Sequence, residues 1–368
     1  MTAVYTVPFE SETCRDVREV GGKALGLAEM TAAGLPVAPG FTVTAAAYRD
    51  FLDENGLRDD VRRILGQVDP DDRPTYDAAE RALTERLSRA PLPARVADEV
   101  RRAYAELNAR IGRDDVPVAV RSSATAEDSG GDSFAGEFET WVDVVGAEDV
   151  LAYVHRCYLS VFAGRVLSYA LERGIDLRTV EMAVVVQKTV RARSAGVMFT
   201  LDPISGDRSR IVLESNWGLG LSVVGGEVTP DRYVVNKVSL SLDMRALGDK
   251  RVEYRRGDRS VPVPEDRRER LSLEDHEVLA LAALGRRLEQ LQGGPQDIEF
   301  AVDEDLPRDA NLVLLQCRPE TVWSSVKRAP AFDAGAGLMS WITGSIGAES
   351  RAPAGSADGH GRGGHRHG

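Results

Sequence analysis

The sequence predicts an α+β fold, in the broad sense of a mixed α/β architecture, for this chain of 368 residues. Strand-like runs that are rich in β-branched residues, such as 182–190, are interleaved with amphipathic helical segments such as 271–291. Few of these segments alternate as strand, helix and strand, which argues against a doubly wound parallel sheet. The length also exceeds that of a typical single domain, so we expect two domains or one large two-lobed unit.

Composition and charge narrow the class of protein. The chain has 46 basic and 58 acidic residues, a net charge of -12, and 43% hydrophobic residues. This balance argues against nucleic acid or an anionic membrane as a partner, although a local basic pocket could still bind phosphate. The cysteines Cys14, Cys157 and Cys317 have neither metal-ligand nor disulfide spacing, which fits a reducing cytoplasm. Because no apolar run approaches ~20 residues and no secretory leader is visible, we expect a cytoplasmic protein without membrane spans.

The first half of the chain is expected to combine helices with short strands. A helical pattern over 21–30 stops before Gly34 and Pro36, which are residues that end helices, and Thr44 is a typical N-cap. Apolar spacing and β-branched runs predict the other elements. These are a strand at 41–43, a helix from 44 to about 55, solvated helices within 57–113, a strand at 116–120, a loop at 121–136, a strand at 139–145 and a long helix at 147–173.

The second half is expected to be richer in strands. Its predicted strands are 182–190, 196–200, 210–214 and segments between 232 and 242, followed by a helix at 271–291 and a hairpin of strands at 297–302 and 311–318. The segment 324–368 is rich in Gly, Ala and Ser, and we expect most of it to be disordered.

The hairpin places several polar side chains in step. Asp297 and Glu299 alternate with apolar residues along one strand, as Gln316 and Arg318 do along the other. If the two polar faces coincide, carboxylate and amide oxygens of the kind that bind Mg²⁺ lie beside a guanidinium that can hold phosphate. The alternative is a half-exposed hairpin with a solvated face.

Three other features are compatible with a phosphate site. The loop 121–136 is dense in Gly, Ser and Thr, and Arg121 follows a buried strand; the alternative is a flexible surface loop. Lys23 follows two glycines at a predicted helix start, although such a sequence is common by chance. Gln187 interrupts an apolar run, where its amide needs either a purine edge or a backbone group as its partner. Neither a Walker A motif nor a dinucleotide-binding GxGxxG that follows a predicted strand is present.

Taken together, these segments resemble one known family. The matching blocks occur in order: GGKALGLAEM (21–30), GLPVAPGFTVTAAAY (34–48), VAVRSSATAEDS (118–129), SFAGEFET (133–140), VVVQKTV (184–190), SAGVMFTLDP (194–203), WGLGLSVVGGEVTPD (217–231), PQDIEFAV (295–302) and LLQCRPET (314–321). Over roughly 15–323 the chain resembles the ATP-binding domain of the phosphoenolpyruvate synthase and pyruvate phosphate dikinase family, which rifampin phosphotransferase shares. The resemblance implies a two-lobed ATP-grasp-like fold, with an N-terminal lobe at 1–190, a C-terminal lobe at 191–323 and the tail at 324–368.

The resemblance also implies roles for single residues. Lys23, Arg121 and Arg318 match the family's phosphate-contacting cations, which we expect to be catalytic. Glu299 and Gln316 match the positions that hold Mg²⁺. The full set expected to bind ATP and its metal is Lys23, Arg121, Ser122, Ser123, Thr125, Gln187, Asp297, Glu299, Gln316 and Arg318.

Members of this family pass a pyrophosphoryl group from ATP to a histidine on a mobile domain and release AMP. That histidine lies in a segment resembling TGGxxSH, which this sequence does not contain. We therefore expect the ATP-binding subunit of a split dikinase-type phosphotransferase, whose carrier and acceptor domains lie on a partner chain. Pyruvate is one candidate for the final acceptor, and other acceptors stay open. The alternatives are a non-catalytic ATP-binding module that regulates a partner, and a chain that is active alone.

Overall fold

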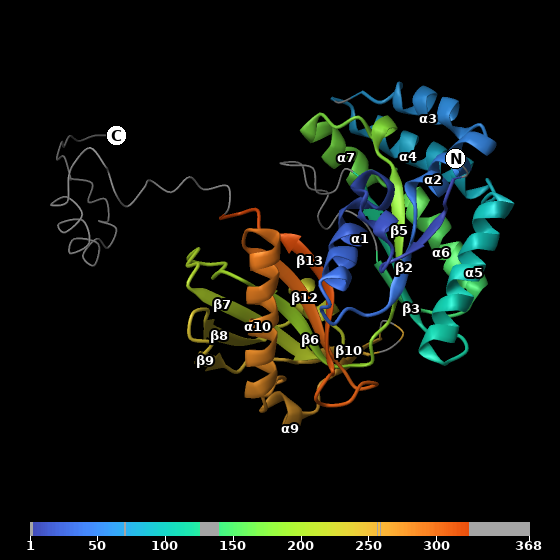
Figure 1. The fold of residues 1–368 in the computed structure, drawn as a ribbon. Coiled ribbons are helices and arrows are strands. Elements are labelled where there is room, and N and C mark those ends of the chain that lie inside the picture. The colour runs from blue at the N-terminus through green and yellow to red at the C-terminus, as the bar shows by residue number, and fades with distance from the viewer. Residues whose placement is uncertain (1–2, 70, 126–139, 256, 258, 324–368) are drawn as a thin grey trace, which may run out of the picture. The chain divides into compact units, whose positions relative to one another are not determined.

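Two antiparallel sheets with helices packed against them make up most of the computed structural model, which describes residues 3–69, 71–125, 140–255, 257 and 259–323 (Figure 1). The predicted mixed α+β class is confirmed. Residues 1–321 form one compact unit. Within this unit the chain passes from the first sheet to the second between Lys188 and Ala192. The division into lobes at 190 and 191 stays a prediction, and the tail 324–368 lies outside the described residues.

The first sheet has five strands in the order β1-β2-β5-β3-β4. Their bounds are Thr6–Pro8 (β1), Gly40–Val43 (β2), Val118–Ala124 (β3), Thr140–Val144 (β4) and Met182–Lys188 (β5). Six helices accompany this sheet: α2 (Ala45–Glu54), α3 (Leu57–Leu65), α4 (Arg73–Ser88), α5 (Ala94–Ile111), α6 (Ala147–Ser160) and α7 (Gly164–Arg173). Their buried faces join the strand residues Val118, Val184 and Val186 in one apolar core.

The second sheet has six strands in the order β13-β12-β6-β7-β8-β9. Their bounds are Ala192–Phe199 (β6), Arg210–Trp217 (β7), Asp231–Asn236 (β8), Leu242–Ala246 (β9), Gln296–Asp303 (β12) and Leu312–Pro319 (β13). The long helix α10 (Asp275–Gln292) lies along one face of this sheet (Figure 1). Leu281 and Leu288 of α10 pack there against Ile298 and Phe300 of β12.

Helix α1 (Val17–Ala32) links the two sheets. Its residues Leu27 and Met30 belong to the core of the second sheet, although the helix precedes strand β2 of the first sheet in the chain. Gly21 interrupts its helical geometry with a φ of 72°, and a Cβ at this position would lie 2.2 Å from the carbonyl oxygen of Ser123. Glycine is therefore required where the helix crosses strand β3.

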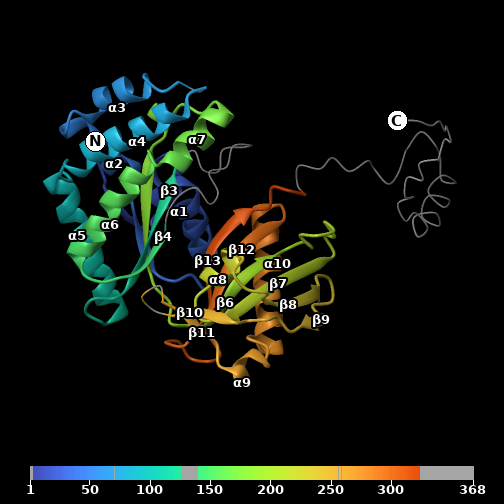
Figure 2. The ribbon, with the colours of Figure 1, turned by 180° about the vertical axis from the view of Figure 1, so that it is seen from behind.

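A small hairpin of β10 (Val252–Arg255) and β11 (Arg259–Pro262) lies beside the second sheet, with α8 (Leu221–Val224) and α9 (Glu265–Arg268) (Figure 2). Lys250, which precedes the hairpin, is fully buried and donates to Asp231 at 2.5 Å. Asp231 also accepts the backbone N–H and the hydroxyl of Ser272. A buried charge is tolerated here because its partner carboxylate is fully hydrogen-bonded.

Two sequence predictions about elements need correction. The segment 121–124 was expected to begin a loop, but it continues strand β3 as far as Ala124. Pairing of β3 with both β5 and β4 supplies hydrogen bonds and burial that a short polar sequence does not reveal. The predicted long helix at 147–173 is two helices, α6 and α7, separated at 161–163.

No helix in the described part of the chain has the length and apolar character to cross a bilayer.

Candidate nucleotide-binding site

Arg121 lies where the two sheets approach each other. It is carried by β3, and its Nη2 donates to Oε2 of Glu299 on β12 at 2.8 Å. Its Nη1 donates to the carbonyl oxygen of Leu315 on β13 at 3.2 Å. Its Nε is buried and has no hydrogen-bond partner among the described residues. The contact between a cation of the first sheet and a carboxylate of the second defines the centre of the candidate site.

The hairpin of β12 and β13 presents its polar residues on one face. The register pairs Glu299 with Gln316 and Asp297 with Arg318. Residues that are directly opposite on antiparallel strands project to the same side, so all four side chains share this face. Arg318 Nε lies 3.4 Å from Asp297 Oδ2. The two polar faces of the predicted hairpin therefore coincide.

This face carries oxygen atoms of the chemical kind that binds Mg²⁺. Burial raises the pKa of Asp297 to about 6, against the opposing effect of Arg318, and Glu320 raises it further. Asp297 Oδ1 is buried without a hydrogen-bond partner among the described residues. Carboxylate oxygens of Glu299 and Asp297 and the amide oxygen of Gln316 are hard ligands of the kind that Mg²⁺ prefers.

Lys23 joins the same region from helix α1. Its Nζ donates to the carbonyl oxygen of Ser122, the residue that follows Arg121, at 3.0 Å. A continuous set of contacts thus runs from Lys23 through β3 to Glu299 and its partner Gln316. Residues from the two ends of the described chain are brought together, as the resemblance implied, while their roles towards a nucleotide stay predictions.

The serine and threonine side chains of this strand contact protein atoms. Ser122 and Ser123 are both fully buried. The hydroxyl of Ser123 donates to the carbonyl oxygen of Val20 at 2.8 Å and accepts the N–H of Ala24. Thr125 exchanges hydrogen bonds with the backbone of Glu181. These residues hold α1 and β5 in place, and the rest of the expected phosphate loop, 126–136, lies outside the described residues.

Gln187 on β5 is buried, and its amide Nε2 donates to the carbonyl oxygen of Ala38 at 3.1 Å. Of the two partners considered from the sequence, the backbone group is therefore the one present. Its expected place near the adenine base stays a prediction.

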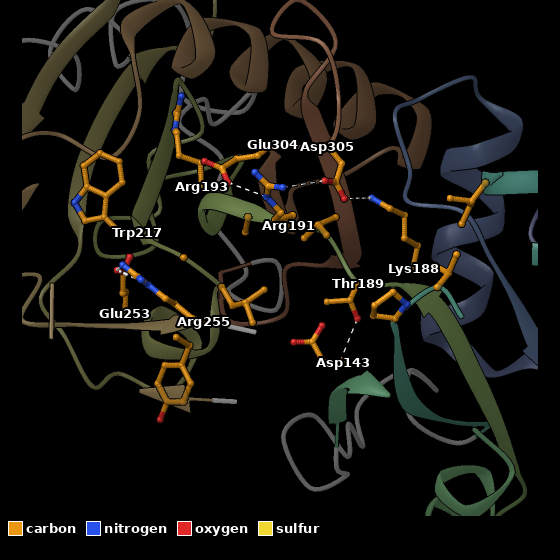
Figure 3. Close-up of a pocket in the computed structure, with 18 of the residues that line it drawn as sticks. Asp143, Lys188, Thr189, Arg191, Arg193, Trp217, Glu253, Arg255, Glu304 and Asp305 are labelled. Carbon is orange, nitrogen blue, oxygen red and sulfur yellow. Dashed lines mark hydrogen bonds and ion pairs between the residues drawn. The ribbon is translucent and has the colours of Figure 1, made fainter. Parts of the chain in front are cut away.

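A cavity of about 680 Å³ lies at the connection between β5 and β6 (Figure 3). Thr189 and Val190 of the connection form part of its wall, and Trp217 and Tyr254 contribute from the second sheet and the small hairpin. None of the predicted site residues lines this cavity. Two of its lining residues lie near predicted site residues in the sequence, since Lys188 directly follows Gln187 and Pro117 lies four residues before Arg121.

Paired charges line much of this cavity. Arg191 bonds Glu304 at 3.1 Å, and Arg267 bonds Glu253 at 2.9 Å. The guanidinium of Arg267 also lies over the ring of Trp217, 4.5 Å from its centroid. Sequence reasoning did not assign these residues, although the glycine-rich WGLG segment that contains Trp217 was visible in the sequence.

Comparison with known proteins shows the family of this chain. Residues 17–335 match the family described as pyruvate phosphate dikinase, AMP/ATP-binding domain. The chain belongs to this family. The resemblance stated from the motifs is therefore confirmed, and the pyruvate phosphate dikinase AMP/ATP-binding domain accounts for nearly all of the described residues.

Three relatives of this family illustrate the similarity. A probable phosphoenolpyruvate synthase of Staphylothermus marinus is 40% identical over 347 residues, which cover 87% of this chain and 42% of the relative. One from Methanothermobacter thermautotrophicus is 42% identical over 320 residues, covering 86% and 46%. The phosphoenolpyruvate synthase of Pseudomonas aeruginosa is 39% identical over 339 residues, covering 87% and 42%. The chain therefore spans less than half the length of these relatives.

Proposed function

We propose that this protein is the ATP-using part of a dikinase-type phosphotransferase, which passes a pyrophosphoryl group from ATP to a histidine on a carrier protein and releases AMP. The observation that carries the proposal is the meeting of Arg121 from one sheet with Glu299 from the other. A triphosphate and its metal require cations and carboxylates to converge in one place, and family membership supplies the ATP-binding class.

The cations act on the phosphates in this proposal. Lys23 and Arg121 approach from α1 and β3, and Arg318 approaches from β13. Arginine can hold two phosphate oxygens with its planar group, whereas lysine supplies a compact charge. Positioned cations of this kind stabilise the charge that develops as a phosphoryl group is transferred.

Glu299 and Gln316 would hold Mg²⁺, with Asp297 beside them on the same face. When bound there, Mg²⁺ supplies neutralisation of the phosphate oxygens. The two carboxylates and the amide would hold the metal ion on the second sheet, opposite the cations that the first sheet contributes.

The base of ATP is assigned to the cavity at the connection of β5 and β6. Its volume of about 680 Å³ falls within the range of roughly 300–1,000 Å³ typical of small-molecule sites. Thr189 and Val190 line this cavity, and they follow the strand that carries Gln187. The phosphates would then extend along β3 towards Arg121.

The phosphoryl acceptor is assigned to another protein. A histidine ring nitrogen attacks the β-phosphorus, the bond between this phosphorus and the oxygen that bridges to the α-phosphate breaks, and AMP leaves with that oxygen. The two described histidines have other contacts, since His155 bonds the carbonyl oxygen of Leu87 and His276 lies 3.3 Å from Glu274. Neither of these two is placed beside the candidate site by a contact, and the family's TGGxxSH segment is not in this sequence, so we propose a histidine of a partner chain as the acceptor. Pyruvate is a candidate for the final acceptor because the relatives are named phosphoenolpyruvate synthases.

The test follows AMP formation from ATP by the purified 368-residue chain, with and without a purified protein that carries the segment TGGxxSH. We expect the chain to bind ATP with Mg²⁺, and to form AMP rapidly only when the carrier protein is present. Rapid AMP formation by the chain alone would contradict the partner requirement. Binding of ATP without AMP formation under either condition would favour the regulatory module instead.

Two variants connect the reaction to the site. Glu299→Ala is expected to abolish AMP formation and to leave the circular dichroism spectrum unchanged. Glu214→Ala removes a carboxylate from the same sheet and serves as the matched control, for which we expect AMP formation to persist. Unchanged turnover in Glu299→Ala would remove the hairpin from the site.

A further inference from the structure

The ion pair of Arg121 and Glu299 joins two residues that the proposed function uses for opposite purposes. Arg121 is assigned to phosphate, and Glu299 is assigned to the metal. In the structure their side chains are 14% and 26% exposed, and they satisfy each other at 2.8 Å. The guanidinium therefore lies on the carboxylate that the metal would use.

We propose that Arg121 is the resting occupant of the metal position, so that the site admits ATP and its divalent cation together and discriminates against either one alone. This inference rests on the proposed function, because it concerns the same residues. It adds a specificity role for the pair that ATP binding by itself does not require.

The discrimination follows from what each ligand would leave behind. A divalent cation that binds alone takes Glu299 and leaves the largely buried Arg121 without its carboxylate. Stranding one member of a buried ion pair is unfavourable. Metal-free ATP takes Arg121 and leaves the Glu299 carboxylate facing a triphosphate, which is a repulsive contact. When both bind, Arg121 contacts phosphate and Glu299 contacts the metal, so neither side chain is left without a partner of opposite charge. Binding of the two ligands is therefore cooperative, and each must raise the affinity of the other by the same factor.

The surroundings of Arg121 support such an exchange. Its Nη1 keeps a bond to the carbonyl oxygen of Leu315, and this contact does not involve Glu299. Its Nε is buried without a partner among the described residues, so a turn of the guanidinium breaks no hydrogen bond at this atom. The guanidinium can thus turn from carboxylate to phosphate while it stays anchored to β13.

A carboxylate of similar exposure provides the control. Glu214 on β7 belongs to the same cross-strand row as Glu299, through Val197 of β6. It is 27% exposed and pairs with Arg232 at 3.5 Å. Glu214→Gln therefore removes the same charge from the same sheet without touching the pair in question.

The experiment measures the dissociation constant of ATP by titration calorimetry, in EDTA and in excess Mg²⁺, for the full chain and two variants. Glu299→Gln keeps an oxygen that can accept from Arg121 but removes the repulsive charge. We expect this variant to bind metal-free ATP about tenfold more tightly than the unmodified chain. Adding Mg²⁺ should then increase its affinity for ATP by a smaller factor than in the unmodified chain. Glu214→Gln is expected to change metal-free binding by less than about twofold, because Glu214 pairs with Arg232 and lies two strands away from Glu299, where screening by salt weakens its effect.

The reverse experiment uses Mn²⁺ alone, followed by electron paramagnetic resonance. We expect no binding to the unmodified chain and measurable binding to Arg121→Ala, in which Glu299 is released. Failure of the unmodified chain to bind ATP even with Mg²⁺ would overturn the proposed function. Normal Mg-ATP binding, but no tightening of metal-free ATP in Glu299→Gln or an equal tightening in Glu214→Gln, would overturn only this inference. Absence of Mn²⁺ binding to folded Arg121→Ala would count against it in the same way.

Discussion

Lys188 Nζ lies 2.7 Å from Asp303 Oδ2, and this ion pair joins the last residue of β5 to the last residue of β12. The Asp303 side chain is 1% exposed and that of Lys188 is 12% exposed. The other carboxylate oxygen of Asp303 accepts the backbone N–H groups of Arg191 and Asp305. One buried carboxylate therefore fixes both the end of a strand and the connection that leads from the first sheet to the second.

We expect Asp303→Ala to lower the free energy of unfolding by about 3–5 kcal/mol, because it removes the acceptor of two backbone N–H groups and leaves Lys188 with only the more distant Asp305, at 3.8 Å. Urea unfolding followed by circular dichroism measures this loss. Glu85→Ala is the matched control, since Glu85 and Arg89 form an exposed pair at 2.7 Å. Exposed pairs contribute about 0–1 kcal/mol. Equal losses in the two variants would show that burial does not increase the contribution of the Asp303 pair to stability.

Most elements of the fold were predictable because they depend on local periodicity. The hairpin at 297–302 and 311–318 became β12 and β13, and its in-step polar residues share one face as alternation requires. Strand β3 was only half predicted. Its residues Ser122 and Ser123 are polar in sequence yet fully buried, because β5 pairs with both of them and α1 packs on the hydroxyl of Ser123. Tertiary pairing overrides local composition at such a place.

The candidate site was likewise predictable only in part. The types and order of Lys23, Arg121, Glu299 and Gln316 could be recognised from motifs, but their contacts depend on how two sheets approach each other. The ion pair of Arg121 and Glu299 spans 178 positions of sequence, and no periodicity encodes such a distance. The cavity at Thr189 was missed for a related reason, since its walls come from segments that are far apart in the chain.

Gly21 and Gly34 allow a second prediction, which compares the effect of an alanine at each position on stability. Both have a positive φ, 72° and 67°, but a Cβ at Gly21 would lie 2.2 Å from the carbonyl oxygen of Ser123, whereas nothing lies within 4 Å of one at Gly34. We expect Gly34→Ala to cost about 1–2 kcal/mol of stability from backbone strain alone. Gly21→Ala should cost more, because the collision adds to the same strain.

The collision at Gly21 should also weaken ATP binding. A displaced Ser123 moves β3, and with it the neighbouring carbonyl oxygen of Ser122 that holds Lys23. Melting temperature and the dissociation constant of ATP, measured for both variants, separate the two effects. A Gly21→Ala protein that is as stable as Gly34→Ala would show that α1 can move away from β3 without loss.

The three cysteines give a prediction about pH. All three are buried, and burial raises the pKa of Cys14 to about 11 and that of Cys317 to about 12. Because the thiolate is the reactive form, the folded protein at pH 8 should not react with a thiol reagent such as DTNB, whereas the unfolded chain should release three equivalents. The folded state holds the protons of Cys14 and Cys317 more tightly than the unfolded state. Their contribution to stability is therefore complete below the usual thiol pKa of about 9 and is lost as the pH rises towards 11–12.

Cys317 makes this measurement informative about the site. It lies between Gln316 and Arg318 on β13, but it belongs to the opposite face of the sheet, where its Sγ donates to Gln296 Oε1 at 3.2 Å. Binding of Mg-ATP on the polar face should therefore leave Cys317 unreactive, and it should not change the rate of reaction with DTNB at pH 8. Reaction of Cys317 in the folded protein at that pH would mean that β13 separates from α1 and the core beneath it. The site described on this hairpin would then lack a rigid support.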